Sequence, residues 1–190
     1  MISLKIEQIY ASPVFLSGLA TLILTTKQVG LLDHYYKVHL ERILRLHQST
    51  PVPVVFFLAG RLPIQAQLHL KMISLFGIIC RLSDGNNFLS KVATSFFSSF
   101  PTQRTKSWFN GLRKIFVIYN LPHPLHWLRG RPSKESVKEV AKASVLKYWL
   151  KLLREQASKL TSTMYLKTDF LGLTRCHPIF SYCPPSSWEV

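Results

Sequence analysis

Cysteine is scarce in this sequence, and its three copies do not form a recognisable pattern. An odd number at uneven spacing does not fit a disulfide framework and is typical of a reducing compartment. Cys176 adjoins His177, with Cys183 nearby, but a structural zinc site needs four ligands at close, recognisable spacing. We therefore predict no metal site, no cofactor and an intracellular location, either nuclear or cytoplasmic.

Acidic residues are also few, nine against 24 lysines and arginines. The chain has no Asp-Asp or Asp-x-Asp pair, whereas a two-metal phosphoryl-transfer site brings carboxylates together on one rigid edge. It also lacks the Gly-x-Ser-x-Gly elbow of hydrolases, the Gly-x-x-x-x-Gly-Lys phosphate loop and the Gly-x-Gly-x-x-Gly dinucleotide motif. We therefore predict that the chain is not an enzyme and has no small-molecule substrate.

Long apolar runs are missing as well. A transmembrane helix needs roughly 20 apolar residues, and the longest run here, 13–24, is interrupted by Ser17, Gly18 and Thr21. Glu7 and the lack of a small-residue cleavage site argue against a signal peptide. We expect 14–25 to be a buried element, either helical or extended, and predict no transmembrane segment.

Positive charge is the main chemical feature that the sequence does have. Its formal net charge is +15, spread along the chain. Such an excess is typical of proteins that meet nucleic acid, an anionic membrane surface or an acidic partner. The alternative is that the lysines only form solvated helix faces of a structural or interaction module and bind no anionic partner.

Apolar residues at three- and four-residue spacing predict helices at 26–47, 52–58, 64–82 and 107–119. We find no alternating strands at regular spacing, so we predict an all-α fold, an irregular helical bundle. Thr50 before Pro51 is expected to cap the second of these helices, and Gly60 is expected to end it.

Residues 133–160 predict the longest helix, with Ser133 as N-cap and Glu135 in the first turn, where the helix dipole favours an acid. Its apolar stripe is expected to contain Val137, Val140, Ala141, Ser144, Val145, Tyr148, Trp149, Leu152, Leu153, Gln156 and Leu160. Its polar face carries Lys134, Lys138, Lys142, Lys147, Lys151, Arg154 and Lys159.

The bundle is expected to be either single or divided in two. The Ser-, Thr- and Phe-rich stretch 94–106 has no sustained period and is the best linker candidate. It separates a helical subdomain at 1–93 from a basic helical subdomain at 107–160. An irregular tail at 161–190 follows.

Aromatic residues are interleaved with basic ones in the second half of the chain. Trp108, Trp127, Tyr148 and Trp149 lie near arginines and lysines in sequence. Such groups can stack on bases while the cations neutralise phosphates. The alternative is that these large aromatic side chains are buried in the core of a small domain.

An ordered series of short motifs resembles a known family. The motifs are His47-x-x-Thr50-Pro51, Leu58-x-Gly60-x-Leu62-Pro63, Ser107-Trp108-Phe109, Tyr119-x-Leu121-Pro122-His123-Pro124, Ser133-Lys134-Glu135, Trp149 with Leu153-Arg154-x-x-Ala157, Leu171-x-Leu173-Thr174 and His177-Pro178. In this order they resemble the C-terminal region of non-LTR (LINE-type) retrotransposon polyproteins, downstream of the reverse transcriptase palm.

The resemblance implies thumb-like and post-polymerase helices that hold template RNA or target DNA while a polymerase core, absent from this chain, does the chemistry. The subdomain at 1–93 would then be thumb-like. The aromatic-x-Asp-Asp motif of the palm is absent, so no catalytic residue of the family carries over. The chain would be a non-catalytic fragment, and a relic open reading frame without retained function is a further alternative.

Charge and resemblance together predict a nonspecific RNA- or DNA-binding surface on the long basic helix. We expect the phosphate contacts to come from Arg129, Arg131, Lys134, Lys138, Lys142, Lys147 and Lys151. Not all of them can face one groove, because Lys147 lies well round the helix from Lys142.

Overall fold

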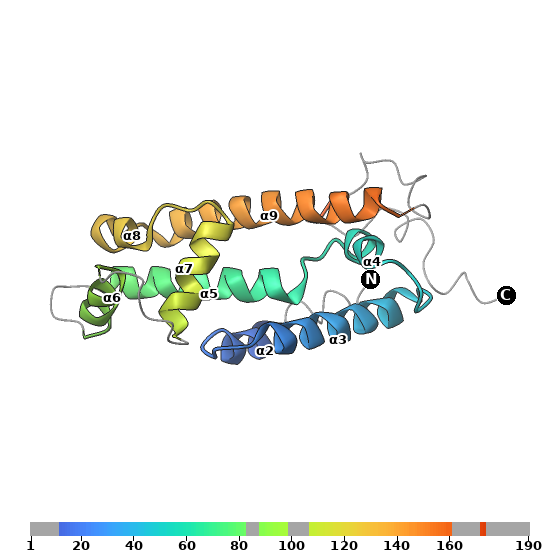
Figure 1. Cartoon of the computed structure of the whole chain (residues 1–190), viewed down its shortest axis with the longest axis horizontal. Helices are drawn as coiled ribbons and strands as arrows, with labels where there is room; N and C mark the ends of the chain where they lie inside the picture. Colours follow the sequence, from blue (N-terminus) through green and yellow to red (C-terminus); the bar gives the residue numbers. More distant parts are fainter. Residues whose placement is uncertain (1–11, 83–87, 99–106, 161–171, 174–190) are drawn as a thin grey trace. The chain divides into compact units, whose positions relative to one another are not determined.

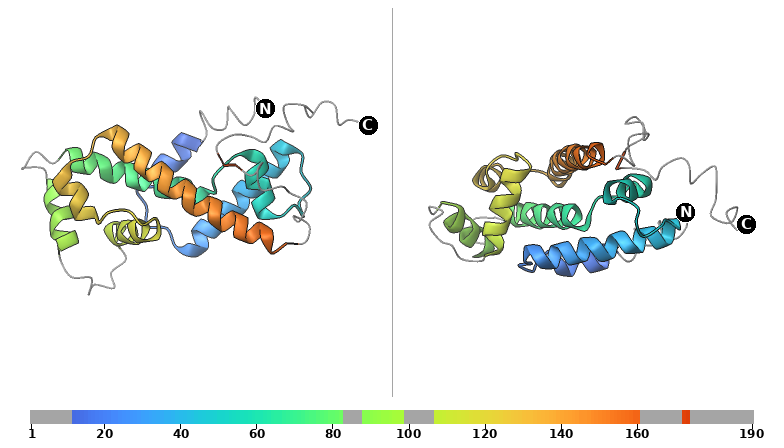
Figure 2. Two further views of the ribbon diagram at one scale, coloured as in Figure 1. Left: turned by 90° about the horizontal axis from the view of Figure 1, so that it is seen from above. Right: turned by 45° about the vertical axis from the view of Figure 1, so that its right-hand side comes forward.

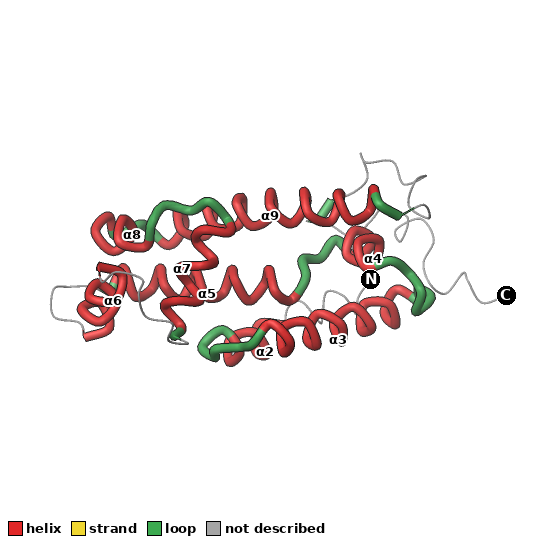
Figure 3. Tube along the Cα trace, viewed as in Figure 1, coloured by secondary structure: helices red, strands yellow, loops and turns green. Residues whose placement is uncertain are grey.

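The structure, a computed structural model, describes residues 12–82, 88–98, 107–160 and 172–173. This part of the chain contains eight α-helices and no β-strand, as Figure 1 and the tube in Figure 3 show. The all-α fold predicted from the sequence is confirmed. In chain order the helices are α2 (Ser12–Leu19), α3 (Thr26–Leu44), α4 (Val52–Ala59), α5 (Ile64–Arg81), α6 (Phe88–Ser98), α7 (Trp108–Ile118), α8 (Pro124–Gly130) and α9 (Lys134–Ser158).

The described helices belong to two compact units whose segments alternate along the chain. The first unit contains α3, α4 and the second half of α9, and the second unit contains α6, α7, α8, most of α5 and the first half of α9. The subdomains expected from the sequence are instead consecutive stretches. Helix α6 occupies 94–98 of the expected linker. Residues 1–11, residues 99–106 and most of the expected tail at 161–190 lie outside the described residues.

The first unit is built on α3, which packs against α4. Helix α3 begins with a capping box, in which the Thr25 hydroxyl accepts the Gln28 N–H and the Gln28 side chain accepts the Thr25 N–H. The rings of Tyr36 and Phe56 lie 6.3 Å apart. The buried apolar side chains of these two helices are Tyr36, Leu40, Leu44, Val55, Phe56, Phe57 and Ala59.

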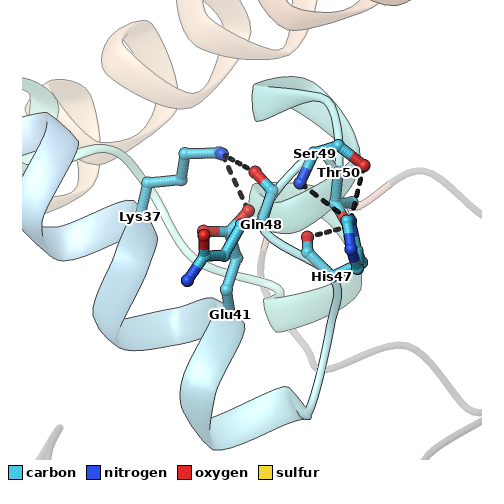
Figure 4. Close-up of polar contacts among 6 residues, drawn as sticks. All are labelled: Lys37, Glu41, His47, Gln48, Ser49 and Thr50. Atoms are coloured by element: carbon cyan, nitrogen blue, oxygen red, sulfur yellow. Dashed lines mark hydrogen bonds and ion pairs between the residues drawn. The ribbon is translucent and has the colours of Figure 1, made fainter.

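A buried ion pair within α3 lies beside the loop that follows this helix (Figure 4). Lys37 Nζ lies 2.7 Å from the Glu41 carboxylate and donates a hydrogen bond to the Gln48 carbonyl at 3.2 Å. The Glu41 side chain is only 3% exposed. Lys37 therefore neutralises a buried charge and fixes the loop at the same time.

The start of α4 differs from the prediction. The Thr50 hydroxyl donates backward to the His47 carbonyl at 2.6 Å, as Figure 4 shows, so it does not cap α4. Pro51 is the N-cap residue and makes no side-chain cap bond. The predicted end of the helix is confirmed, because Gly60 follows it with a φ of 63°, a conformation that glycine adopts without strain.

An aromatic core holds the second unit together. Phe76 of α5 meets Phe97 of α6 edge-to-face at 5.6 Å and Phe116 of α7 at 5.7 Å. Trp127 of α8 lies 5.0 Å from the Phe116 ring. Phe76, Phe97, Phe116 and Trp127 are all buried, so one cluster of rings fixes four helices.

Helix α9 runs without a break from Lys134 to Ser158, and Figure 2 shows it from two further directions. Its buried residues recur every four positions, at Val137, Ala141, Val145, Trp149, Leu153 and Ala157. A step of four residues overshoots one helical turn by about 40°. The buried line therefore winds around the helix, and Val140, Tyr148, Gln156 and Leu160, which the sequence placed on the apolar stripe, are exposed.

No single helix in the described ranges is long and apolar enough to cross a membrane. Helices α4 and α5 meet that requirement only together, as a bent pair.

Candidate nucleic-acid interface

Helix α8 positions the two candidate arginines. Its N-cap is His123, whose Nδ1 accepts the Leu125 N–H at 3.3 Å. Trp127 is buried on the opposite part of this short helix, and Arg129, two residues later, is exposed. Arg131 ends the helix in the left-handed region, with a φ of 42°, and its N–H donates to the Trp127 carbonyl at 2.9 Å. The buried tryptophan thus anchors a corner from which both arginines face solvent.

Helix α9 starts as the sequence predicted. The Ser133 hydroxyl accepts the Ser136 N–H at 3.1 Å, and Glu135 lies in the first turn. Lys134, Lys138 and Lys142 follow at steps of four residues, on a line parallel to the buried one. All three are exposed.

All seven predicted contact residues are exposed, but they do not form one surface. Arg129, Arg131, Lys134, Lys138 and Lys142 belong to the second unit, and we call them the first basic group. Lys147 and Lys151 belong to the first unit. Along the helix, Lys147 is rotated by about 140° from Lys142, which agrees with the expectation that one groove cannot meet both.

Arg154 joins Lys147 and Lys151 on their side of α9, because all three fall within about 60° of the helix circumference. We call these residues the second basic group. The sequence prediction placed Arg154 on the polar face but did not include it among the contact residues. Its position was available from helical spacing alone, once the helix was known to continue without a break as far as Ser158.

The positions of the acidic side chains affect the electrostatic field around α9. Asp33 and Glu41 are turned inward in the first unit, where Asp33 Oδ1 accepts the Gln65 N–H at 3.2 Å and Glu41 pairs with Lys37. The exposed acids of the described ranges are Glu135, Glu139 and Glu155, all on α9. The first basic group has five cations and only two neighbouring glutamates, Glu135 and Glu139, so this stretch of the chain carries a net positive charge.

The ion pair that Lys151 makes in the second basic group is weak. Lys151 lies 3.8 Å from Glu155, and both side chains are largely exposed, so solvent screens this pair. Among the described residues, no ion pair joins Glu135 or Glu139 to the three lysines of the first basic group. These lysines thus keep their charge available to an external anion.

The aromatic candidates divide between core and surface. Trp127 and Trp149 are buried, and Trp108 Nε1 donates to the Ala20 carbonyl at 2.9 Å, which ties this half-buried ring to the fold. Tyr148 is 38% exposed. Of the four aromatic residues singled out in the sequence, only Tyr148 is thus classed as exposed, and it follows Lys147 and precedes Lys151 by three residues in the sequence.

Arg113, another basic residue near these aromatics in sequence, has a structural role. Its guanidinium lies over the rings of Phe96 and Phe97, at 5.8 and 5.7 Å from their centroids. It also donates long hydrogen bonds to the carbonyls of both residues, at the C-terminal end of α6. A cation there is favoured by the helix dipole.

The groups with a shifted pKa do not form a catalytic cluster. Burial raises the pKa of Asp33, in the first unit. Burial lowers the pKa of His69 to about 4 and raises that of the Cys80 thiol to about 12. The last two lie on α5, about 16 Å apart along the helix axis. In the described ranges, no group of three or more His, Cys, Asp or Glu side chains could hold a metal ion.

No protein-family model, curated protein or solved structure matches this chain.

Proposed function

We propose that the chain is a nonspecific nucleic-acid-binding fragment of the kind found in the C-terminal region of non-LTR retrotransposon reverse transcriptases. The observation that carries this proposal is the first basic group, a line of exposed cations at the junction of α8 and α9. Cations at this density bind the phosphate backbone without reading sequence, because they release counterions condensed on the nucleic acid. We infer no catalytic role.

The order of the motifs supports the link to retrotransposons. Several of them fall at helix ends, where they shape the corners that present the cations. Tyr119-x-Leu121-Pro122-His123-Pro124 spans the end of α7 and the start of α8, and Ser133-Lys134-Glu135 starts α9. RNA or DNA binding by the first basic group would need these corners intact.

The test is the salt dependence of binding. Replacing Lys134, Lys138 and Lys142 with glutamine removes three charges and keeps good helix formers in α9. We expect the slope of log affinity against log salt for duplex DNA to become shallower by up to about 3, since each phosphate contact contributes about 0.9.

A matched control removes the same charge elsewhere. Lys27, Lys91 and Lys114 are exposed and lie outside both basic groups. Their glutamine variants should keep the wild-type slope, although the net charge falls equally from +15 to +12. Equal effects of the two triple variants would show that net charge alone drives binding and would refute the assigned site.

A second candidate, a helical interaction module, is favoured by exposed apolar side chains in the second unit. Phe88 at the start of α6 is 75% exposed, and Val117 near the end of α7 is 76% exposed. Apolar side chains at such positions can contact a protein partner. This candidate predicts no salt-sensitive binding to RNA or DNA by the folded chain.

A further inference from the structure

An exposed aromatic residue adjoins the second basic group in the sequence, and the first basic group has no such neighbour. Tyr148 lies next to Lys147 in the sequence, and Lys151 follows three residues later on α9. On a helix, residues three apart are neighbours on the surface. Tyr148 therefore has the exposed Lys151 as its surface neighbour, and the exposed Lys147 directly precedes it in the chain.

The ring is also held in place. The buried Trp149 meets Tyr148 edge-to-face, with ring centroids 5.9 Å apart and planes at 81°. A braced ring loses little conformational freedom when it binds a ligand, so more of the contact energy remains for affinity. An aromatic side chain that is 38% exposed on a polar helix face is suited to contact from outside.

Resting on the proposed function, we propose that Tyr148, Lys147 and Lys151 form a stacking platform for unpaired bases, so that the second basic group binds single-stranded RNA or DNA. Stacking on an aromatic ring needs a free base face, which a single strand offers and a duplex hides inside its stack. The two lysines would hold the phosphates on either side of the stacked base. The first basic group, which has no exposed aromatic residue of its own, would bind strand and duplex alike.

The experiment measures the affinity of the full chain for a fluorescein-labelled single strand of mixed sequence and for the blunt duplex that it forms with its complement. Fluorescence anisotropy across a salt series gives both affinity and slope. We expect Tyr148→Ala to weaken single-strand binding on the order of five- to tenfold. Duplex affinity should change less than about twofold, and both salt slopes should stay unchanged because no charge is lost.

Two variants serve as controls. Tyr148→Phe keeps the ring and should bind the single strand like the wild type. Tyr35→Ala removes another exposed tyrosine, 68% exposed on α3 and outside both basic groups, and should leave both affinities unchanged. Helical circular dichroism of Tyr148→Ala should match the wild type, and an equal loss on strand and duplex would overturn the proposal.

The outcomes separate this inference from the proposed function. If Tyr148→Ala binds the single strand normally while Lys147→Gln with Lys151→Gln weakens it, the lysines bind nucleic acid and the stacking platform is refuted. If the folded wild type binds neither strand nor duplex in a salt-sensitive way, the proposed function fails and this inference fails with it.

Discussion

Stability should depend on pH through one partly buried histidine in the second unit. His69 on α5 is largely enclosed, and its Nδ1 lies 2.7 Å from the Tyr119 hydroxyl beyond α7. Burial lowers the pKa of His69 from 6.5 to about 4 because the charged imidazolium would lose its hydration. In the protonated ring Nδ1 can donate to the Tyr119 hydroxyl, so this contact does not oppose protonation and desolvation is the main cost.

The sign and size of the effect follow from the two pKa values. In the unfolded chain His69 takes up a proton near its ordinary pKa of 6.5, whereas in the folded chain it does so only near 4. The unfolded state therefore gains protons first as the pH falls. Stability conferred by the neutral ring is fully present above pH 6.5 and is lost on acidification until about pH 4. Between pH 7 and pH 5 the loss is about 2 kcal/mol.

The assay compares urea unfolding of three proteins at pH 7 and pH 5. His69→Gln removes the titrating ring but keeps a side chain that can bond to the Tyr119 hydroxyl. Its stability should fall by about 2 kcal/mol less than that of the wild type over this pH range. His126→Gln, at an exposed position on α8, should behave like the wild type.

The result that would refute this reasoning is a parallel loss of stability. If the wild type and His69→Gln lose the same free energy between the two pH values, the ring is hydrated in solution and its burial does not hold it neutral. The comparison is a difference between variants, so other titrating groups, including Asp33 with its raised pKa, cancel to first order.

Two further predictions concern packing and buried charge. A Cβ on Gly77 would lie 2.9 Å from Val137 Cγ1, so Gly77→Ala should lower the free energy of unfolding in urea by about 1–3 kcal/mol. Adding Val137→Ala should recover part of this loss. Unchanged stability of Gly77→Ala would show that α5 and α9 are not in such close contact. Lys37→Met leaves the Glu41 carboxylate buried without a partner among the described residues and should cost about 3 kcal/mol. Adding Glu41→Leu should restore most of this in a double-mutant cycle, and simple additivity would contradict the buried pair.

Local signals in the sequence were enough to predict the long helices and several of the residues at which helices begin or end. The predicted helix at 26–47 corresponds to α3, and the predicted N-cap Ser133 and terminating Gly60 are both confirmed. These features depend on backbone geometry within a few residues. Prediction from the sequence failed where contacts between residues distant in sequence determine whether a segment is helical. Helix α6 reaches Ser98 through Ser- and Thr-rich sequence because Phe97 is buried against Phe76 and Phe109.

The exposure of the candidate contact residues was predictable, whereas the exposure of the aromatic residues was not. Lysines and arginines outside an ion pair are costly to bury, so their place on the surface follows from chemistry alone. Tryptophan and tyrosine fit either location. Trp149 and Tyr148 are adjacent in sequence, yet one is 8% exposed and the other 38%. Which of the two is buried depends on the rotation of α9 about its own axis, and this rotation is set by tertiary packing.

The spacing of α9 explains why its cations form two groups rather than one. Its buried positions repeat every four residues, from Val137 to Ala157, while the helix repeats every 3.6. Each step turns the buried line by about 40°, so five steps carry it about 200° around the helix. Lysines that keep a constant offset from this line must wind with it. Lys138 and Lys142 lie one residue after a buried position, whereas Lys147 and Lys151 lie two residues after one, so a further rotation of about 100° separates the two groups. Only the second group lies next to Tyr148 in the sequence. Under the proposed function, substitution of Tyr148 should weaken single-strand binding alone, whereas substitutions in the first basic group should weaken the binding of strand and duplex alike.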